Sequence, residues 1–260
     1  MPPEPTIDVA ELVKHYRASD GTVIRAVNGV SLSVDAGEMV GLLGANGAGK
    51  TTTLRMLATL LEPTAGTARV AGCDIRHDPV GVRRRLGYVS ATTGVADRLS
   101  AREIFTSFGR LHGIPAETLP HRVETLLAQL DLEGCADRPA GRLSSGQRQR
   151  ISLGRALVHA PPALVLDEPT NALDVIGARD LLELLGRLRG EGHAILLSTH
   201  RLHEIENRCD RFVIIHGGRV VAAGTRDSLV AEWIPNGEGE LEDAFFAAIR
   251  SRTAIPETLP

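Results

Sequence analysis

The segment Gly44–Thr51 constrains the fold of this chain more than any other part of its sequence. It reads GANGAGKT and satisfies the phosphate-loop pattern GxxxxGK[ST]. It lies between the continuous apolar stretch Glu38–Leu43 and the helical pattern Thr52–Leu61, which is the strand-loop-helix context that the pattern requires. The sequence therefore predicts an α/β fold in which a glycine-rich loop joins a buried strand to a helix and binds phosphate.

The residue types of this loop suit the phosphates of a nucleotide. Glycines let the backbone wrap around a phosphate with its N–H groups pointing inward, and the following helix adds the positive end of its dipole. Lys50 can reach the phosphate oxygens as a compact cation, and Thr51 can offer its hydroxyl to Mg²⁺. An exposed lysine in an ordinary turn is a poorer explanation, because Lys14 and Lys50 are the only lysines among 29 basic residues. The residues expected to contact the nucleotide here are Gly44, Asn46, Gly47, Ala48, Gly49, Lys50, Thr51 and Thr52.

A pair of acids, Asp167 and Glu168, follows the apolar stretch Ala163–Leu166. Both carboxylates are expected at the C-terminal edge of the sheet, where the phosphate loop also lies. We predict that Asp167 holds Mg²⁺ through its water shell and that Glu168 faces the attacking water as base or orienting group. His200 follows another apolar strand at the same edge and is predicted to hydrogen-bond a γ-phosphate oxygen. The predicted catalytic residues are therefore Glu168, His200 and Lys50, and the predicted metal ligands are Thr51 and Asp167.

The composition limits the partners and the compartment. The 260 residues are 43% hydrophobic and 23% charged, so the chain can bury a core without disulfide bonds. No apolar run approaches the roughly 18 residues that cross a bilayer, and the N-terminus has no secretory pattern. Three scattered cysteines fit a reducing compartment, so a cytoplasmic location is expected. The net charge of −3 gives no basic field, and nucleic acid is not an expected partner.

The order of the predicted elements indicates a mainly parallel core sheet with two additions. Short β-type stretches between Ile7 and Val34 predict an N-terminal antiparallel layer. Helical patterns alone fill Ser100 to about Ala140, beginning with a capping box formed by Ser100 and Glu103. Alternation of strands and helices then resumes. The later elements are expected as helix Gly146–His159, strand Ala163–Leu166, helix Asp174–Leu188, strand Ala194–Ser198, helix Leu202–Cys209, hairpin strands Phe212–His216 and Arg219–Ala223, and helix Glu240–Ile249.

This pattern divides the chain into three parts. Residues 1–90 and 141–225 are predicted to form a nucleotide-binding α/β core, and residues 91–140 a helical subdomain inserted into it. Residues 226–260 are predicted to form a short C-terminal helical tail after a connector that contains proline and glycine.

These motifs, together with Leu143–Gln147 (LSSGQ) ahead of Asp167, resemble the ATP-binding subunits of ABC transporters. The resemblance covers essentially the whole chain and implies a P-loop NTPase of the ABC ATPase fold, with ATP and Mg²⁺ as cofactors. It implies that Tyr16 stacks on adenine, although an ordinary edge-strand tyrosine is the alternative. It further implies that two chains close head to tail on ATP. The partner-facing residues would be Ser144, Gly146 and Gln147 of the signature and Asp174 at the end of the D-loop Asn171–Asp174.

A narrower likeness concerns the segments Leu54–Leu60, Glu62–Gly66, Asp97–Glu103 and Phe108–His112. They look like those of the sodium-extrusion (NatA-type) exporter subunits, as does the short C-terminal tail. The likeness implies a subunit that is peripheral on the inner face of the cell membrane and bound there by an integral membrane permease. It implies a homodimer or an ATPase heterodimer. Sodium would be the exported substrate, with a drug, an antibiotic or a lipid as alternatives.

Three positions depart from the family pattern. Ala91 stands where the family usually has the Q-loop glutamine, Ser145 stands in the signature where glycine is usual, and Ala172 stands in the D-loop where exporters often have glycine. The first departure raises the question of what completes the Mg²⁺ site, with Ser90, Thr92 and Asp97 as alternatives. Two other functions remain open at this point. They are a soluble ABC ATPase that acts on nucleic acid or ribosomes, and a module that senses ATP without hydrolysing it.

Overall fold

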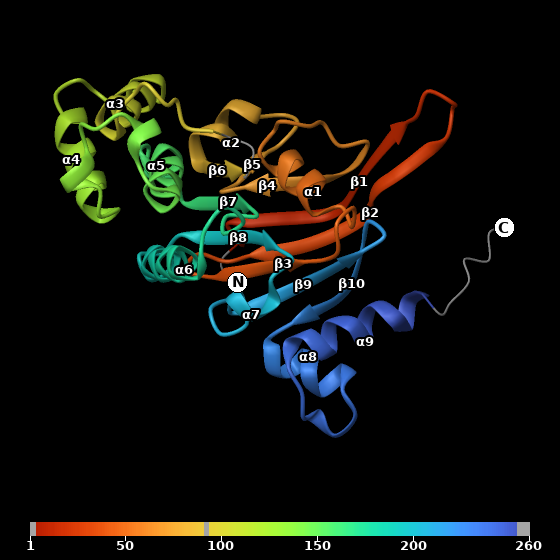
Figure 1. The fold of residues 1–260 in the computed structure, drawn as a ribbon. Coiled ribbons are helices and arrows are strands. Elements are labelled where there is room, and N and C mark those ends of the chain that lie inside the picture. Colours follow the sequence, from red (N-terminus) through yellow and green to blue (C-terminus); the bar gives the residue numbers. More distant parts are fainter. Residues whose placement is uncertain (1–3, 91–93, 254–260) are drawn as a thin grey trace.

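The computed structural model describes residues 4–90 and 94–253, which form two β-sheets with helices around them (Figure 1). The larger sheet has the strand order β10-β9-β3-β8-β7-β6, and five of these strands run parallel while β10 runs antiparallel at one edge. The predicted mainly parallel sheet is confirmed. Its strands are β3 (Met39–Leu43), β6 (Leu86–Ser90), β7 (Ala163–Asp167), β8 (Ala194–Thr199), β9 (Arg211–His216) and β10 (Arg219–Gly224).

The smaller sheet contains the predicted N-terminal antiparallel layer. Its strand order is β2-β1-β4-β5, and each neighbouring pair is antiparallel. The two N-terminal strands are longer than the short stretches predicted from the sequence, and they form a hairpin whose tip projects beyond the sheet (Figure 1). The strands are β1 (Ile7–Arg17), β2 (Val23–Val34), β4 (Ala65–Val70) and β5 (Cys73–Asp74).

Alternate residues of the central strands serve two separate apolar cores. Val40 and Leu42 of β3 lie in a core with residues of β1, β2, β4 and helix α1 (Lys50–Leu57), whereas Met39 and Leu43 lie in the other core with residues of the helices that follow residue 100. Period-two alternation of this kind is what a strand buried on both faces requires. Helix α1 is therefore packed between the two sheets, and the phosphate loop that precedes it is fixed at both of its ends.

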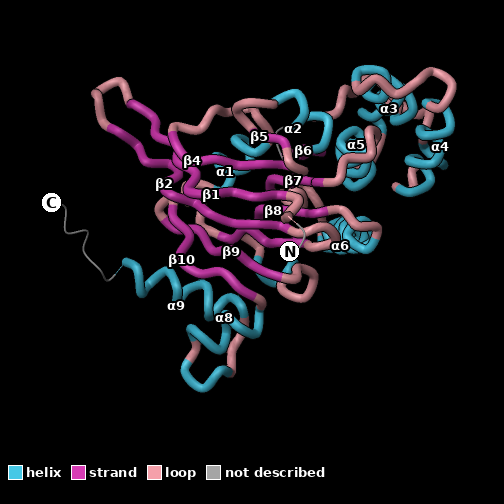
Figure 2. The backbone as a smooth tube through the Cα atoms, turned by 180° about the vertical axis from the view of Figure 1, so that it is seen from behind, coloured by secondary structure: helices cyan, strands magenta, loops and turns pink. Residues whose placement is uncertain are grey.

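Helices α3 (Ala101–Leu111), α4 (Leu119–Gln129) and α5 (Ser145–Leu157) gather at one end of the molecule, beside β6 and β7, in both views (Figures 1 and 2). The predicted capping box is present, because Ser100 Oγ accepts from the Glu103 amide while Glu103 accepts from the Ser100 amide. Close contact between α3 and α5 needs Gly154, since a Cβ there would lie 2.2 Å from the Phe105 ring. The boundaries 91–140 of a helical subdomain stay a prediction.

The structure corrects several predicted elements. The expected helix Leu202–Cys209 is a single turn, α7 (Leu202–Ile205), because the chain then bends to bring Asp210 Oδ2 within 2.8 Å of the Met39 amide. The connector expected before the last helix contains α8 (Arg226–Trp233), which has only Leu229 and Val230 buried and so lacks a clear apolar period. The other helices are α2 (Pro79–Arg85), α6 (Val175–Gly190) and α9 (Leu241–Thr253). Among the described residues no helix has the length and apolar character to span a bilayer.

Candidate active site

The phosphate loop borders a cavity of about 430 Å³ at the C-terminal edge of the parallel sheet. Side chains from β1, β2, the loop, α1 and the ends of β7 and β8 meet there, so segments far apart in the sequence form one site. The lining residues are Tyr16, Ile24, Ala26, Ala45, Asn46, Gly47, Ala48, Gly49, Lys50, Thr51, Thr52, Glu168, Asn171 and His200. The structure thus brings together most residues that the sequence assigns to the nucleotide.

Two glycines of the loop are required by close backbone approach. A Cβ on Gly49 would lie 2.5 Å from the Ala26 carbonyl oxygen of β2, and Gly49 has a φ of 109°, which disfavours other residues. A Cβ on Gly44 would lie 2.5 Å from the Ile215 carbonyl oxygen of β9. Gly44 does not line the cavity but supports the loop from beneath. The loop is therefore pressed between β2 and β9 with its first helical N–H groups at the cavity.

Lys50, the first residue of α1, is buried and folds back over its own loop. Its Nζ donates to the carbonyl oxygens of Gly44 (2.6 Å) and Ala45 (3.3 Å) and lies 3.7 Å from Glu168 Oε1. Burial lowers the pKa of Lys50 from its ordinary value, while the carboxylates of Glu168 and Asp167 act in the opposite direction. Among the described residues, Glu168 is the only acid within ion-pair distance of the Lys50 ammonium group. Glu168 is also a predicted catalytic residue.

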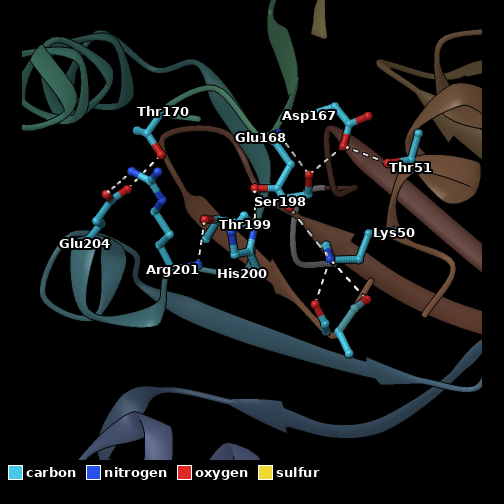
Figure 3. Close-up of polar contacts among 12 residues, drawn as sticks. Lys50, Thr51, Asp167, Glu168, Thr170, Ser198, Thr199, His200, Arg201 and Glu204 are labelled. Carbon is cyan, nitrogen blue, oxygen red and sulfur yellow. Dashed lines mark hydrogen bonds and ion pairs between the residues drawn. The ribbon is translucent and has the colours of Figure 1, made fainter. Parts of the chain in front are cut away.

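Asp167 lies under the loop and is tied to two hydroxyl groups. Its Oδ1 accepts from Thr51 Oγ1 (3.1 Å) and from Ser198 Oγ (2.7 Å), and only 6% of Asp167 is exposed (Figure 3). Residues 167 and 198 are register partners in the parallel pair β7–β8. The contact with Thr51 places the two predicted metal ligands side by side, with hard oxygen atoms of the kind that Mg²⁺ prefers. The residues present fit a Mg²⁺ ion.

Glu168 follows Asp167 in an unusual backbone conformation. Its φ is 51°, in the left-handed region that costs energy for residues other than glycine, and its amide donates to both the carbonyl and the hydroxyl oxygen of Ser198. The carboxylate turns back toward the cavity, and its Oε2 lies 2.9 Å from His200 Nδ1 (Figure 3). The side chain of Glu168 is 13% exposed and that of His200 46% exposed. His200 thus lies in the cavity as predicted, and in this conformation it contacts Glu168.

The signature residues line a different cavity. A space of about 350 Å³ lies at the N-terminus of α5, and it shares no lining residue with the phosphate-loop cavity. Ser144 caps α5 by accepting from the Gln147 amide, which leaves its hydroxyl hydrogen available to an anion. Asp174, the N-cap of α6, faces this cavity and not the phosphate loop. The predicted ligand residues Ser144, Gly146, Gln147 and Asp174 therefore form a second group within the chain.

The phosphate-loop cavity also contains residues that the sequence patterns do not reveal. Ile24 and Ala26 of β2 also line the cavity, and Ile24 is the register partner of Tyr16. Tyr16 is 40% exposed and lies beyond Val13, where the pairing of β1 with β4 ends, so the alternative of an ordinary edge-strand tyrosine stays open. Asn171 also lines the cavity, although the sequence places it only at the start of the D-loop. Ser198 could have been noticed as a polar residue ending an apolar strand. Ala91, the position of the missing glutamine, lies outside the described residues.

Comparisons with known proteins agree on the family. A family model described as "ABC transporter" matches residues 27–171. The chain is 40% identical over 208 residues to the "ABC transporter ATP-binding protein NatA" of Bacillus subtilis (strain 168), covering 80% of this chain and 85% of that protein. It is 42% identical over 204 residues to the "Nod factor export ATP-binding protein I" of Burkholderia lata, covering 78% and 67% of the two chains.

A solved structure supports the same assignment. The "Dimeric Structure of MJ0796, a Bacterial ABC Transporter Cassette" superposes with a TM-score of 0.74 at 26% identity, covering 84% of this chain and 98% of that one. The phosphate loop, the acids Asp167 and Glu168 and the signature cavity thus belong to a chain of known architecture. This chain is an ATP-binding, ATP-hydrolysing member of the ABC transporter family.

Proposed function

We propose that this chain powers export across a membrane by binding and hydrolysing ATP together with an integral membrane permease. The observation that carries the proposal is the position of Glu168 and His200 at the phosphate-loop cavity, 2.9 Å from each other. The name of the Burkholderia relative supports the direction of transport, because that protein is an export ATP-binding protein. The permease would hold this chain on the inner face of the membrane.

The residues of this chain divide the work of hydrolysis among them. Backbone N–H groups of the loop and the Lys50 ammonium bind the β- and γ-phosphate oxygens, and Tyr16 stacks on the adenine. Glu168 orients the attacking water and takes its proton, and His200 holds Glu168 through Nδ1 and can turn its ring toward the γ-phosphate. A bound Mg²⁺, held by Thr51 and through water by Asp167, would neutralise charge that develops on the phosphates.

The second cavity supplies the reason for a dimer. Ser144 and Gly146 face a cavity that contains no phosphate-loop residue, so within one chain they cannot reach the phosphates of a nucleotide bound at Lys50. In a head-to-tail pair each signature would close over the nucleotide of the other chain. The structure of the cassette MJ0796 is dimeric, which supports the pairing of two chains. The pair is either two copies of this chain or this chain with a second ATPase.

The proposed substrate is sodium, by likeness to NatA-type subunits, with drugs, antibiotics and lipids as alternatives. A role on nucleic acid or ribosomes is disfavoured by the net charge of −3 and by the transporter names of the relatives. The test is co-purification of this chain with a multi-span membrane protein, followed by reconstitution of the complex in vesicles. We expect ATP-dependent movement of the substrate out of the ATP-accessible compartment. A chain that hydrolyses ATP but binds no membrane protein when the two are produced together would contradict the proposal.

The Q-loop position provides a test of the Mg²⁺ site. An alanine side chain carries no oxygen, so Ala91 cannot bind Mg²⁺ as the family's glutamine would. We expect Ala91→Gln to lower the Mg²⁺ concentration that gives half-maximal ATPase activity by up to about tenfold, the effect of one added oxygen ligand (~1 kcal/mol). Titrating activity against Mg²⁺ for the wild type and this variant measures the shift, and Ala96→Gln is the control, because it makes the same change at an exposed residue that does not line the phosphate-loop cavity.

The structure also indicates which residue could bind Mg²⁺ in place of the missing glutamine. Neither Asp97 nor Ser90 lines the phosphate-loop cavity. Asp97 packs beside Gly141, which makes it a poor substitute ligand. Ser90 is the register partner of Asp167 in the β6–β7 pair, which makes it the better one. If Ala91→Gln leaves the Mg²⁺ requirement unchanged while Ser90→Ala raises it, Ser90 is the ligand and our explanation fails.

A further inference from the structure

A second set of polar contacts joins the ends of β7 and β8 outside the nucleotide cavity. Thr170 Oγ1 donates to Glu204 Oε2 (2.7 Å), and Arg201 Nη1 donates to Glu204 Oε1 (2.9 Å). In the view of Figure 3 these contacts lie on the opposite side of Glu168 and His200 from Lys50 and Thr51. Both oxygens of the Glu204 carboxylate are thus used, one by each of the two segments.

The two joined segments are those that carry the predicted catalytic pair. Thr170 lies two residues after Glu168, and Glu204 lies in α7, four residues after His200. Thr170 is 2% exposed, and the Glu204 side chain is 19% exposed. Neither residue lines the nucleotide cavity. Their contacts therefore act on the site only through the backbone that they fix.

The backbone at Glu168 needs such support. With a φ of 51° it lies in a region that costs a non-glycine residue about 1 kcal/mol or more, and such a conformation persists only where neighbouring contacts hold it. Ser198 fixes the amide of Glu168 on one side. On the other side Pro169 accepts a hydrogen bond from Gln149 Nε2 of α5 (2.9 Å), and Thr170 is bound to Glu204.

We propose that the Thr170–Glu204–Arg201 cluster is a positioning device for ATP hydrolysis, which holds Glu168 and His200 at hydrogen-bonding distance. Thr170 and Glu204 are positioning residues. They set the separation between the end of β7 and the start of α7, and this separation decides whether the carboxylate of Glu168 points at the attacking water. Errors of about 1 Å in such placements cost up to 10²-fold in rate. This inference rests on the proposed role of Glu168.

The most direct test is Thr170→Val, which keeps the shape of the buried side chain and removes its hydroxyl group. We expect kcat for ATP hydrolysis to fall about tenfold while KM for ATP stays within twofold, because the loop that binds ATP is untouched. Thr170→Ser restores the hydroxyl and should restore most of kcat. The matched control is Ser152→Ala in α5, which removes a buried hydroxyl that has no hydrogen-bond partner among the described residues and should leave kcat unchanged.

A purely structural role for Thr170 would give different results. Loss of folded protein would lower the number of ATP sites per chain along with the rate, so the ATP-binding stoichiometry is measured for each variant. Glu204→Ala serves as a second variant and should lower kcat in the same manner. An unchanged kcat in both Thr170→Val and Glu204→Ala would overturn the proposal, as would a rise in KM with kcat preserved.

Combination with Glu168→Gln separates this inference from the proposed function. Single-turnover hydrolysis is followed in Glu168→Gln with and without Thr170→Val. Once the positioned carboxylate is gone, Thr170→Val should cause no further loss, since residues that act as a unit are not additive. An independent tenfold loss in that background would contradict positioning. If Glu168→Gln itself hydrolyses ATP at the wild-type rate, the proposed mechanism fails, whereas a slow Glu168→Gln with a normal Thr170→Val refutes only the inference.

Discussion

Replacement of Glu168 by glutamine is expected to slow ATP hydrolysis by about 10²–10⁴-fold, or ~3–5 kcal/mol of activation barrier, while ATP still binds. The amide of glutamine has nearly the same shape as the carboxylate and can keep the contact with His200 Nδ1, but it cannot accept a proton from the attacking water. The measurement is single-turnover hydrolysis beside equilibrium binding of ATP.

The charge of Glu168 adds an expectation about ATP affinity. The change also removes the negative charge that lies 3.7 Å from Lys50 Nζ, so ATP affinity should rise or stay the same, since Lys50 becomes freer to bind phosphate. Glu183→Gln on α6 is the control, because it makes the same chemical change at a carboxylate that lines neither cavity. Unchanged turnover in Glu168→Gln would remove this residue from the mechanism.

ATP is expected to convert the Glu168→Gln variant from monomer to dimer, and ADP is expected to return it to monomer. Ser144 and the first N–H groups of α5 form an anion site that can meet a γ-phosphate only from another chain. Sedimentation in saturating ATP or ADP measures the change. Ser144→Arg in the same background should weaken the ATP-bound dimer by at least about 10²-fold, because a long side chain would fill the anion site.

The control for this experiment is Thr125→Arg, which places the same side chain on the exposed face of α4 and should leave the dimer intact. An ATP complex that stays monomeric at high concentration contradicts pairing of two identical chains. If addition of a second ATPase chain then produces a dimer, the heterodimer is the correct assembly. If it does not, the head-to-tail arrangement is wrong for this protein.

The parts of the site that the sequence predicts are those set by strand order. Asp167, Glu168 and His200 each follow an apolar strand of a parallel sheet, so the fold carries them to the edge where Gly44–Thr51 lies. This topology places Glu168 and His200 in one cavity with Lys50, and it places Asp167 beneath the loop in contact with Thr51.

The parts that the sequence does not predict depend on register and on local turns. Ser198 binds Asp167 because the two residues are paired in β7 and β8, and nothing in either strand alone fixes that register. Thr170 and Glu204 are 34 residues apart in the chain, so neither local pattern predicts their contact. Helix α7 is also shorter than the apolar pattern predicted. The sequence does not predict the bounds of α8 within the predicted helical tail, because few of its residues are buried. In each case tertiary contacts decide what the local pattern leaves open.

In its folded-back position Lys50 is occupied by oxygen atoms of the site itself. The same ammonium group that must receive the phosphates is held by the Gly44 and Ala45 carbonyl oxygens and faces the carboxylate of Glu168. An incoming triphosphate has to displace these oxygen atoms from Lys50. In the proposed mechanism the carboxylate of Glu168 therefore loses its contact with Lys50 when the lysine turns to the phosphates. If Lys50 and Glu168 have the proposed roles, binding of the nucleotide would thus be coupled to the release of Glu168 for its contact with water.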